Sequence, residues 1–171
     1  MSLKKELRLH WKKKLLGLSF ERRQEASKAL TLYPFPDGIV ASFVSFREEI
    51  NTAPLNKILA QKNSLALPVV QKDHLVFYHV THLESELVPS KLGILEPIPS
   101  LCKIATQIDV ILVPALVFDT KHHRLGYGKG CYDRFLEKSR AYSIGVGFKE
   151  QLIELLPSDP HDIHLNQLCL V

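Results

Sequence analysis

Hydrophobic positions in the first third of the chain recur at helical spacing. Every fourth residue from Leu3 to Leu15 is apolar, and basic residues fill the positions between them. This period predicts an amphipathic helix that ends near Gly17. Ser19 is typical of a helix N-cap, and Pro34 stops the second helix that follows it. Two helices are therefore expected before any strand.

The rest of the chain alternates short apolar runs with helical patterns. Thr52 can cap a helix that runs to about Lys62, residues 132–139 form a further helix candidate, and the proline-rich stretch Val88–Pro99 is expected to be a loop. The predicted strands are Ile39–Phe46, Leu65–Val70, Leu75–Val80, Ile108–Val113 and Ser143–Phe148. The mostly apolar strand at 108–113, rich in β-branched residues, is typical of a parallel sheet. We expect a single α/β domain over residues 1–171, with a mostly parallel central sheet and helices on both faces.

Composition excludes several classes of protein but adds little about the fold. The chain has 171 residues, is 46% hydrophobic and 23% charged, and has no apolar run near the roughly 20 residues that span a bilayer. No secretory signal is visible, and the three cysteines form no zinc-like or CxxC pair. We therefore expect a cytoplasmic protein without a membrane partner.

The net charge of +4 is unevenly distributed. Residues 1–16 hold six bases and one acid, and residues 121–140 hold six bases and two acids, so the remaining 135 residues carry −5. Two basic segments on an acidic body indicate an anionic partner, either nucleic acid or a phosphorylated molecule. Solvated helix faces are the alternative interpretation, and for Lys12, Lys13 and Lys14 it is the simplest one.

The segment between residues 114 and 129 contains the clearest chemistry. It is a long connection after a buried strand, which is where ligands bind in open α/β sheets. Gly126, Gly128 and Gly130 let a ligand approach main-chain N–H groups, and Arg124 and Lys129 add positive charge. The segment from Gly126 to Gly130 is called the glycine loop below. The spacing matches neither the P-loop nor the dinucleotide fingerprint, but the composition suits a phosphate.

Asp133 follows the last of these glycines by three residues. A carboxylate beside a phosphate site commonly holds Mg²⁺. An acid in the first turn of a helix can equally serve only to stabilise the helix dipole. Both interpretations stay open on local grounds.

The motif from Phe118-Asp119 through Arg124-Leu-Gly-Tyr-Gly-Lys-Gly-Cys-Tyr-Asp-Arg134 resembles the signature of the 5-formyltetrahydrofolate cyclo-ligase family. Weaker matches lie in the expected order along nearly the whole chain. They include Lys4 with Arg8, Leu18-Ser19-x-Glu21-Arg22, Glu49-Ile-Asn-Thr52, Glu96-Pro97, Ile108-Asp109, Val113-Pro114, Gly145 with Phe148, Gln151, Leu156-Pro157 and His161-Asp162.

The resemblance implies an ATP- and Mg²⁺-dependent ligase that converts 5-formyltetrahydrofolate to 5,10-methenyltetrahydrofolate, ADP and phosphate through a phosphorylated formyl group. It implies catalytic roles for Lys129 and Arg124, and metal ligands at Asp133 and Asp162. ATP would contact Lys4, Arg8, Arg124, Leu125, Gly126, Tyr127, Gly128, Lys129, Gly130, Cys131 and Tyr132. Folate would contact Val44, Glu49, Tyr127, Gly128, Gly130 and Tyr132. The partners expected are these two substrates, with no nucleic acid, and the chain is expected to be a monomer.

Two positions depart from the family pattern. Cys131 stands where the family usually has Tyr, and Asn166 stands where an acid often follows His161-Asp162. The first change removes an aromatic side chain, and the second leaves any metal role at that position in doubt. Position 127 varies between Tyr and Arg in the family, and Tyr127 supplies no cation.

Other interpretations remain beside this one. A sugar-phosphate isomerase or transferase would use the same glycine loop without ATP, and Glu49 is its best candidate base. A nucleic-acid-binding module would use the basic first helix, although no matching signature is present. The His122-His123 pair is interpreted as solvated, a zinc site at His161 and His164 is disfavoured by the nearby prolines, and Trp11 is expected in the core.

Overall fold

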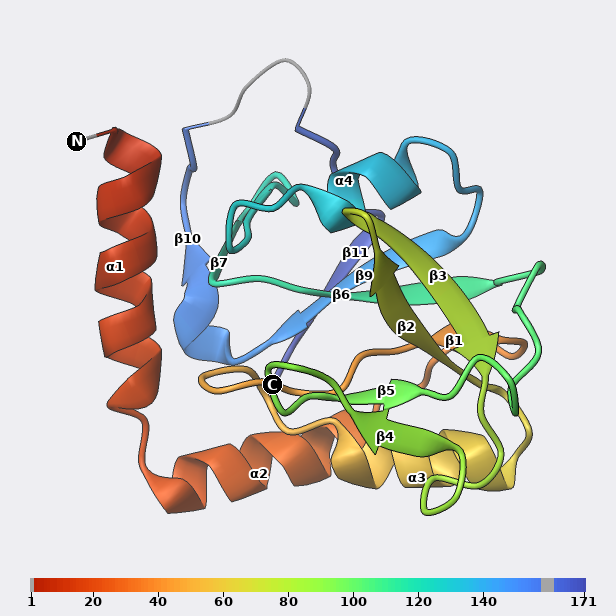
Figure 1. Cartoon of the computed structure of the whole chain (residues 1–171). Coiled ribbons are helices and arrows are strands. Elements are labelled where there is room, and N and C mark those ends of the chain that lie inside the picture. The colour runs from red at the N-terminus through yellow and green to blue at the C-terminus, as the bar shows by residue number, and fades with distance from the viewer. Residues whose placement is uncertain (1, 158–161) are drawn as a thin grey trace.

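The computed structural model describes residues 2–157 and 162–171 (Figure 1). The helices are α1 (Leu3–Leu16), α2 (Phe20–Thr31), α3 (Ala53–Gln61) and α4 (Cys131–Leu136), with a 3₁₀ turn at Lys149–Gln151. The strands are β1 (Val40–Ala41), β2 (Leu65–Gln71), β3 (His74–His79), β4 (Leu87–Pro89), β5 (Leu95–Pro97), β6 (Val110–Pro114), β7 (Val117–Asp119), β8 (Arg124–Leu125), β9 (Tyr142–Gly147), β10 (Leu152–Ile153) and β11 (Gln167–Leu170).

A six-stranded sheet forms the centre of the molecule, in the order β11-β9-β6-β1-β2-β3. The strands from β11 to β2 are parallel to their neighbours, and β3 joins antiparallel at the edge. Residues 110–113 of β6 are all buried, as expected for a strand covered on both faces. The prediction of a mostly parallel sheet is confirmed.

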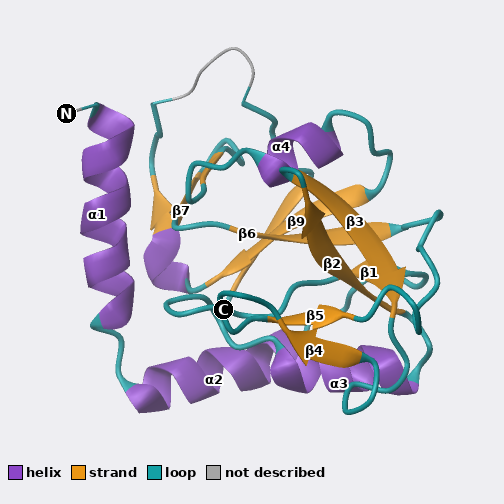
Figure 2. Cartoon of the chain, in the orientation of Figure 1, coloured by secondary structure: helices purple, strands orange, loops and turns teal. Residues whose placement is uncertain are grey.

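Helices cover both faces of this sheet (Figure 2). Val110 and Leu112 of β6 belong to the apolar cluster that also contains residues of α1, α2 and α3, whereas Ile111 and Val113 pack with α4. The alternation follows from the period of two along a strand. In Figure 1, α1 runs along one side of the molecule, and α2 and α3 run along its base.

The first two helices match the sequence prediction closely. α1 ends one residue before Gly17, and its apolar stripe buries Trp11 and Leu15. The Ser19 hydroxyl accepts a hydrogen bond from the Arg22 N–H at 3.1 Å, which is the expected N-cap contact. Trp11 is 4% exposed and therefore belongs to the core, as predicted.

Several segments differ from prediction because side chains or short hairpins compete with the expected structure. Of the strand predicted at 39–46 only β1 forms, since the Thr52 hydroxyl donates to the Phe43 carbonyl at 2.6 Å and fixes a loop there. The same bond means that Thr52 does not cap α3 with its side chain, although α3 begins where predicted. The predicted loop at 88–99 contains the β4–β5 hairpin, and the segment 114–129 contains the β7–β8 hairpin.

The helix predicted at 132–139 is shorter than expected. α4 ends at Leu136, because the chain turns there and the Ser139 hydroxyl accepts the Ala141 N–H at 3.1 Å before β9 begins. In the part of the chain that the structure describes, no helix has the length and apolar character needed to span a bilayer.

Candidate active site

A cavity of about 600 Å³ lies where β1 and β6 reach their carboxyl ends. All fifteen residues that the sequence assigned to ATP, folate or metal line it. They are Lys4, Arg8, Val44, Glu49, Arg124, Leu125, Gly126, Tyr127, Gly128, Lys129, Gly130, Cys131, Tyr132, Asp133 and Asp162. The cavity is called the glycine-loop cavity below. The structure thus brings together residues that are up to 158 positions apart in the sequence.

Two glycines shape the loop that closes one side of this cavity. Gly128 has φ +100° and Gly130 has φ +65°, in the left-handed region that side chains disfavour. A Cβ atom on Gly128 would lie 3.3 Å from the guanidinium carbon of Arg8, so the glycine also permits a close approach by that cation. The Arg8 Nε donates to the Gly126 carbonyl at 2.8 Å, which ties α1 to the loop.

Two of the cations that line the cavity are paired with carboxylates. Lys4 Nζ lies 2.8 Å from an Asp162 oxygen, and Arg124 Nη2 lies 2.5 Å from Asp133 Oδ1. Only 5% of the Arg124 side chain is exposed, so its charge acts with little screening by water. Because α4 is only six residues long, these side chains, rather than a helix dipole, supply most of the attraction for an anion.

Glu49 contributes a partly buried carboxyl group to the cavity wall. Its Oε2 accepts the Phe46 N–H at 2.8 Å. Burial raises the pKa of Glu49 to about 7, with a further contribution from the charge of Glu48. Burial and the charge of Glu49 also raise the pKa of the Tyr132 hydroxyl. The wall therefore holds a carboxyl group that titrates near neutral pH.

The donor set at the cavity fits a magnesium ion bound together with phosphate. Mg²⁺ usually takes one or two carboxylates plus phosphate oxygens, and the Asp133 and Asp162 carboxylates line the same cavity as Lys4, Arg8 and Arg124. Among the described residues no group of three or more His, Cys, Asp or Glu side chains is gathered for metal binding. Two carboxylates alone would thus need phosphate oxygens to complete the coordination.

Lys12 lines the cavity too, which the sequence interpretation of a solvated Lys12–Lys14 face missed. Its ammonium lies 5.2 Å from the centre of the Tyr127 ring. Lys4, Arg8 and Lys12 share one face of α1 at intervals of four residues. This spacing could have predicted that Lys12 lies on the same side as the two assigned cations. By contrast, Lys14 Nζ lies 4.0 Å from the Trp11 ring on another face. The β4–β5 hairpin, expected only as a loop, also lines the cavity, through Leu92, Ile94, Leu95 and Glu96.

The histidine pair is corrected as well. His123 is buried rather than solvated, and its Nδ1 lies 2.9 Å from Asp119 Oδ2. The same carboxylate accepts main-chain N–H groups of Lys121, His123 and Leu156. Burial alone would raise the pKa of Asp119, but these hydrogen bonds outweigh it and lower the pKa. The cluster joins the β7–β8 hairpin to the segment after β10 and is structural.

The two positions that depart from the family pattern lie in different parts of the structure. Cys131 lines the cavity, and its Sγ lies 3.7 Å from Arg134 Nη2. Asn166 Oδ1 accepts hydrogen bonds from the N–H and the hydroxyl of Ser143, at 2.8 and 2.9 Å. Asn166 thus fastens β9 to the segment before β11. His161 lies outside the described residues, and His164 Nδ1 lies 3.0 Å from the Lys121 carbonyl oxygen.

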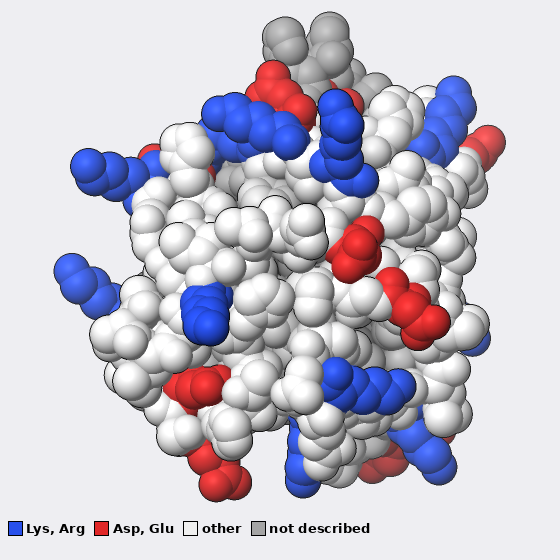
Figure 3. Space-filling model, turned by 90° about the vertical axis from the view of Figure 1, so that its right-hand side faces the viewer, with Lys and Arg blue, Asp and Glu red and all other residues white. Residues whose placement is uncertain are grey.

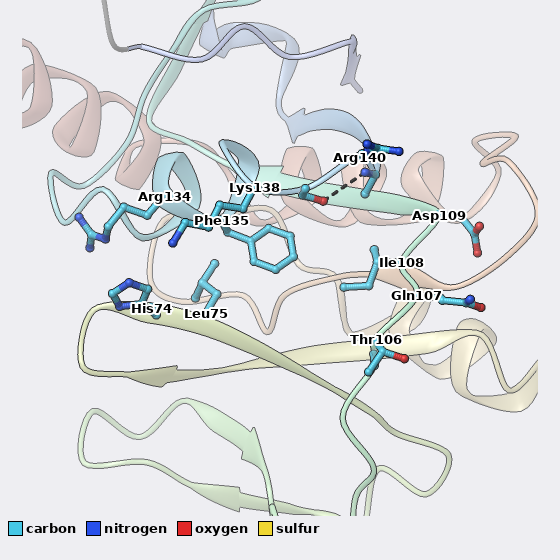
Figure 4. Close-up of a pocket in the computed structure, with 13 residues that line it drawn as sticks. His74, Leu75, Thr106, Gln107, Ile108, Asp109, Arg134, Phe135, Lys138 and Arg140 are labelled. Carbon is cyan, nitrogen blue, oxygen red and sulfur yellow. Dashed lines mark hydrogen bonds between the residues drawn. The ribbon is translucent and has the colours of Figure 1, made fainter.

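A second and larger cavity of about 830 Å³ lies beside α4 and is called the α4 cavity below. It is bounded by the start of β3 and by the segments that precede β6 and β9. Figure 4 shows Phe135 pointing into it, with Arg134 and Arg140 towards opposite ends. Arg134 Nη2 donates to the carbonyl groups of Asp73 and Lys129, both at 2.7 Å.

The fold and the glycine-loop cavity define a single-domain α/β enzyme. The 5-formyltetrahydrofolate cyclo-ligase family profile matches residues 2–171. The chain is 34% identical to the 5-formyltetrahydrofolate cyclo-ligase of Escherichia coli K12, over 85% of each sequence, and 27% identical to the mouse enzyme of that name, over 98% of this chain and 93% of that one. The NMR structure of Aquifex aeolicus 5,10-methenyltetrahydrofolate synthetase superposes with a TM-score of 0.87 at 31% identity, covering 98% of this chain and 89% of that one. The chain therefore belongs to the 5-formyltetrahydrofolate cyclo-ligase family.

Proposed function

We propose that the chain converts 5-formyltetrahydrofolate to 5,10-methenyltetrahydrofolate at the expense of ATP, which leaves as ADP and phosphate. The observation that carries the proposal is the convergence of the fifteen assigned residues on one cavity. Family membership indicates the folate substrate, and the cavity contains side chains suited to both reactants.

The phosphate groups of ATP would lie against α1 and the glycine loop. Lys4 and Arg8 approach from α1, and Lys129 approaches from the loop, so three cations surround one space. Lys129 is exposed at the rim and makes no ion pair with any residue that the structure describes, which suits a group that meets the γ-phosphate. Arg124 would hold Asp133 in place and offset negative charge that develops during transfer.

The folate would occupy the apolar part of the cavity, near Val44 and Glu49. A pterin ring carries N–H groups on one edge, and a carboxylate accepts hydrogen bonds from such donors. Glu49 is the carboxylate on this part of the wall. Tyr127 and Tyr132 line the same cavity and would lie between the two substrates.

The reaction requires no protein nucleophile. The formyl oxygen attacks the γ-phosphorus, the bond to the β–γ bridging oxygen breaks, and ADP leaves. N10 then attacks the formyl carbon and loses its proton, and the carbon–oxygen bond breaks with release of phosphate. The protein's part is to align the formyl oxygen with the γ-phosphate and to stabilise charge. Mg²⁺ held by Asp133 and Asp162 would neutralise charge on the phosphate oxygens.

One chain supplies every residue of the proposed site, so the reaction needs no second copy, and we propose that the protein acts as a monomer. The cysteines Cys102, Cys131 and Cys169 are free thiols. This supports a cytoplasmic setting, which we also propose. On the face seen in Figure 3, which lies away from α1, basic and acidic side chains are interspersed.

The test is a spectrophotometric assay of methenyltetrahydrofolate formation from 5-formyltetrahydrofolate, ATP and Mg²⁺. We expect an absorbance increase that depends on ATP. We further expect Lys129→Ala to lower turnover at least about tenfold, equivalent to ~1.4 kcal/mol of barrier. Folded protein without ATP-dependent product would overturn the proposal, and full turnover by Lys129→Ala would overturn the role of that lysine.

A sugar-phosphate isomerase is the second candidate, and one observation favours it. The pKa of Glu49, about 7, is the value expected of a general base at neutral pH. That enzyme would need a sugar phosphate and no ATP. Turnover of a sugar phosphate in the absence of ATP, together with no product from the folate, would select it.

A further inference from the structure

Glu48 is a buried carboxyl group directly behind the glycine-loop cavity. It is only 2% exposed, and it lies between Arg47 and Glu49, which both line the cavity. Its Oε1 and the hydroxyl oxygen of Tyr127 are the two buried side-chain atoms in the described ranges that make no hydrogen bond of ordinary geometry. Buried polar atoms are nearly always paired, so these two need an explanation.

The Tyr127 hydroxyl is close to two carboxyl groups. Its pKa is raised by burial first, and then by the charges of Glu49 and Glu48. A tyrosine hydroxyl has one proton to donate and can direct it to one acceptor at a time. The hydroxyl can therefore turn either to Glu48, behind the wall, or to Glu49, on the wall.

The segment that carries both glutamates is held firmly. The Ser45 hydroxyl donates to the Ile50 carbonyl at 2.6 Å, and Glu49 Oε2 accepts the Phe46 N–H. The Tyr127 ring, in turn, is placed by the glycine loop and lies 5.2 Å from the Lys12 ammonium. With both sides fixed, rotation of the hydroxyl is the motion that costs least.

We propose that Glu48 is a positioning residue, which accepts the Tyr127 hydroxyl proton and so leaves the Glu49 carboxylate available to the substrate's N–H donors. The inference rests on the proposed function, because it concerns how the folate is bound. Glu48 touches neither substrate. It acts through Tyr127 by removing a donor that would otherwise compete with the folate for Glu49.

The proposal predicts an effect that a purely structural role would not produce. In Glu48→Leu the Tyr127 hydroxyl has only Glu49 left as an acceptor, and it then competes with the folate. The KM for 5-formyltetrahydrofolate should rise about tenfold, the effect of one competing hydrogen bond, with a much smaller change in kcat. Glu48→Gln keeps an acceptor oxygen and should restore a KM within about twofold of the unchanged chain.

The sharpest readout is the double variant Glu48→Leu/Tyr127→Phe. Removal of the competing hydroxyl should lower the KM below that of Glu48→Leu alone, whereas Tyr127→Phe by itself should raise KM or leave it unchanged. Thermal unfolding of each variant establishes that it is folded before the kinetics are compared.

The outcomes separate this inference from the proposed function. An unchanged chain that forms no methenyltetrahydrofolate overturns both. An active chain in which Glu48→Leu leaves the folate KM unchanged overturns the inference alone. So does a double variant whose KM equals or exceeds that of Glu48→Leu. A raised KM that falls again in the double variant supports it.

Discussion

The two cavities of this molecule differ in how their charges are held. The α4 cavity is the larger, at about 830 Å³ against about 600 Å³. Lys138 and Arg140 on its wall are exposed, and the Arg134 guanidinium donates to the main-chain carbonyls of Asp73 and Lys129. The glycine-loop cavity instead holds the nearly buried Arg124 and the perturbed carboxyl group of Glu49.

This contrast shows that the two cavities are distinguished by how their charges are held. Cations that are exposed to water, such as Lys138 and Arg140, are screened and attract an anion more weakly than the nearly buried Arg124 does. Convergent, partly desolvated groups with shifted pKa values are the stronger indication of chemistry. The comparison predicts that equal substitutions at the two cavities have very unequal effects.

The largest effect should come from Arg124→Ala. This change removes a desolvated charge and leaves Asp133 without its partner at 2.5 Å. We expect kcat/KM to fall about 100-fold, or ~2.7 kcal/mol, the scale of a lost charge-stabilising donor. Steady-state kinetics with both substrates measure it. Arg140→Ala, at the α4 cavity, is the matched control, and an equal loss there would break the comparison.

The pH dependence of folate binding should show the next largest effect. Glu49 interacts with Glu48, Tyr127 and Tyr132. Its pKa is raised to about 7, so in the free protein a growing fraction of Glu49 is protonated as the pH falls below 7. A protonated carboxyl accepts pterin N–H groups poorly, so the folate KM should rise as pH falls, towards about tenfold per unit well below pH 7.

Glu49→Gln supplies the control for this profile. Its amide does not titrate, so the KM should be higher than that of the unchanged chain at pH 8 and should vary little between pH 6 and 8. A folate KM of the unchanged chain that is flat over the same range would contradict the assignment of Glu49.

A smaller effect is expected from Arg134→Ala. Arg134 lines the α4 cavity, yet its guanidinium also fixes the Lys129 carbonyl at 2.7 Å. Loss of this bond should loosen the glycine loop and lower kcat about threefold to tenfold, the scale of one or two hydrogen bonds. Lys138→Ala, at an exposed position two residues after the end of α4, should stay within about twofold, as surface changes usually do. A comparable loss in both variants would show that the α4 cavity itself takes part.

Local signals in the sequence were sufficient for much of this picture. The helical period and caps of residues 3–31 predicted α1 and α2, and the apolar run at 108–113 predicted a strand buried on both faces. The motif from Arg124 to Arg134 identified the glycine loop. These features depend on neighbours within a few residues, so they can be recognised without the fold.

Contacts between residues that are far apart in the sequence could not be predicted from such local patterns. His123 is buried because Asp119 and the segment near Leu156 meet it, and α4 ends early because of the turn into β9. Lys12 belongs to the cavity because α1 packs beside Tyr127, which is 115 positions away in the sequence. Glu48 is the clearest case, since it is only 2% exposed and no neighbouring residue in the sequence predicts its burial.

The proposed function depends most on one step, the phosphorylation of the formyl oxygen within the glycine-loop cavity. The most direct measurement uses 5-formyltetrahydrofolate labelled with ¹⁸O in the formyl group and follows the released phosphate by ³¹P NMR. We expect the label to appear in phosphate. The rate of its appearance should fall in Arg124→Ala and should be unchanged in Arg140→Ala. Methenyltetrahydrofolate that forms while the phosphate remains unlabelled would contradict it.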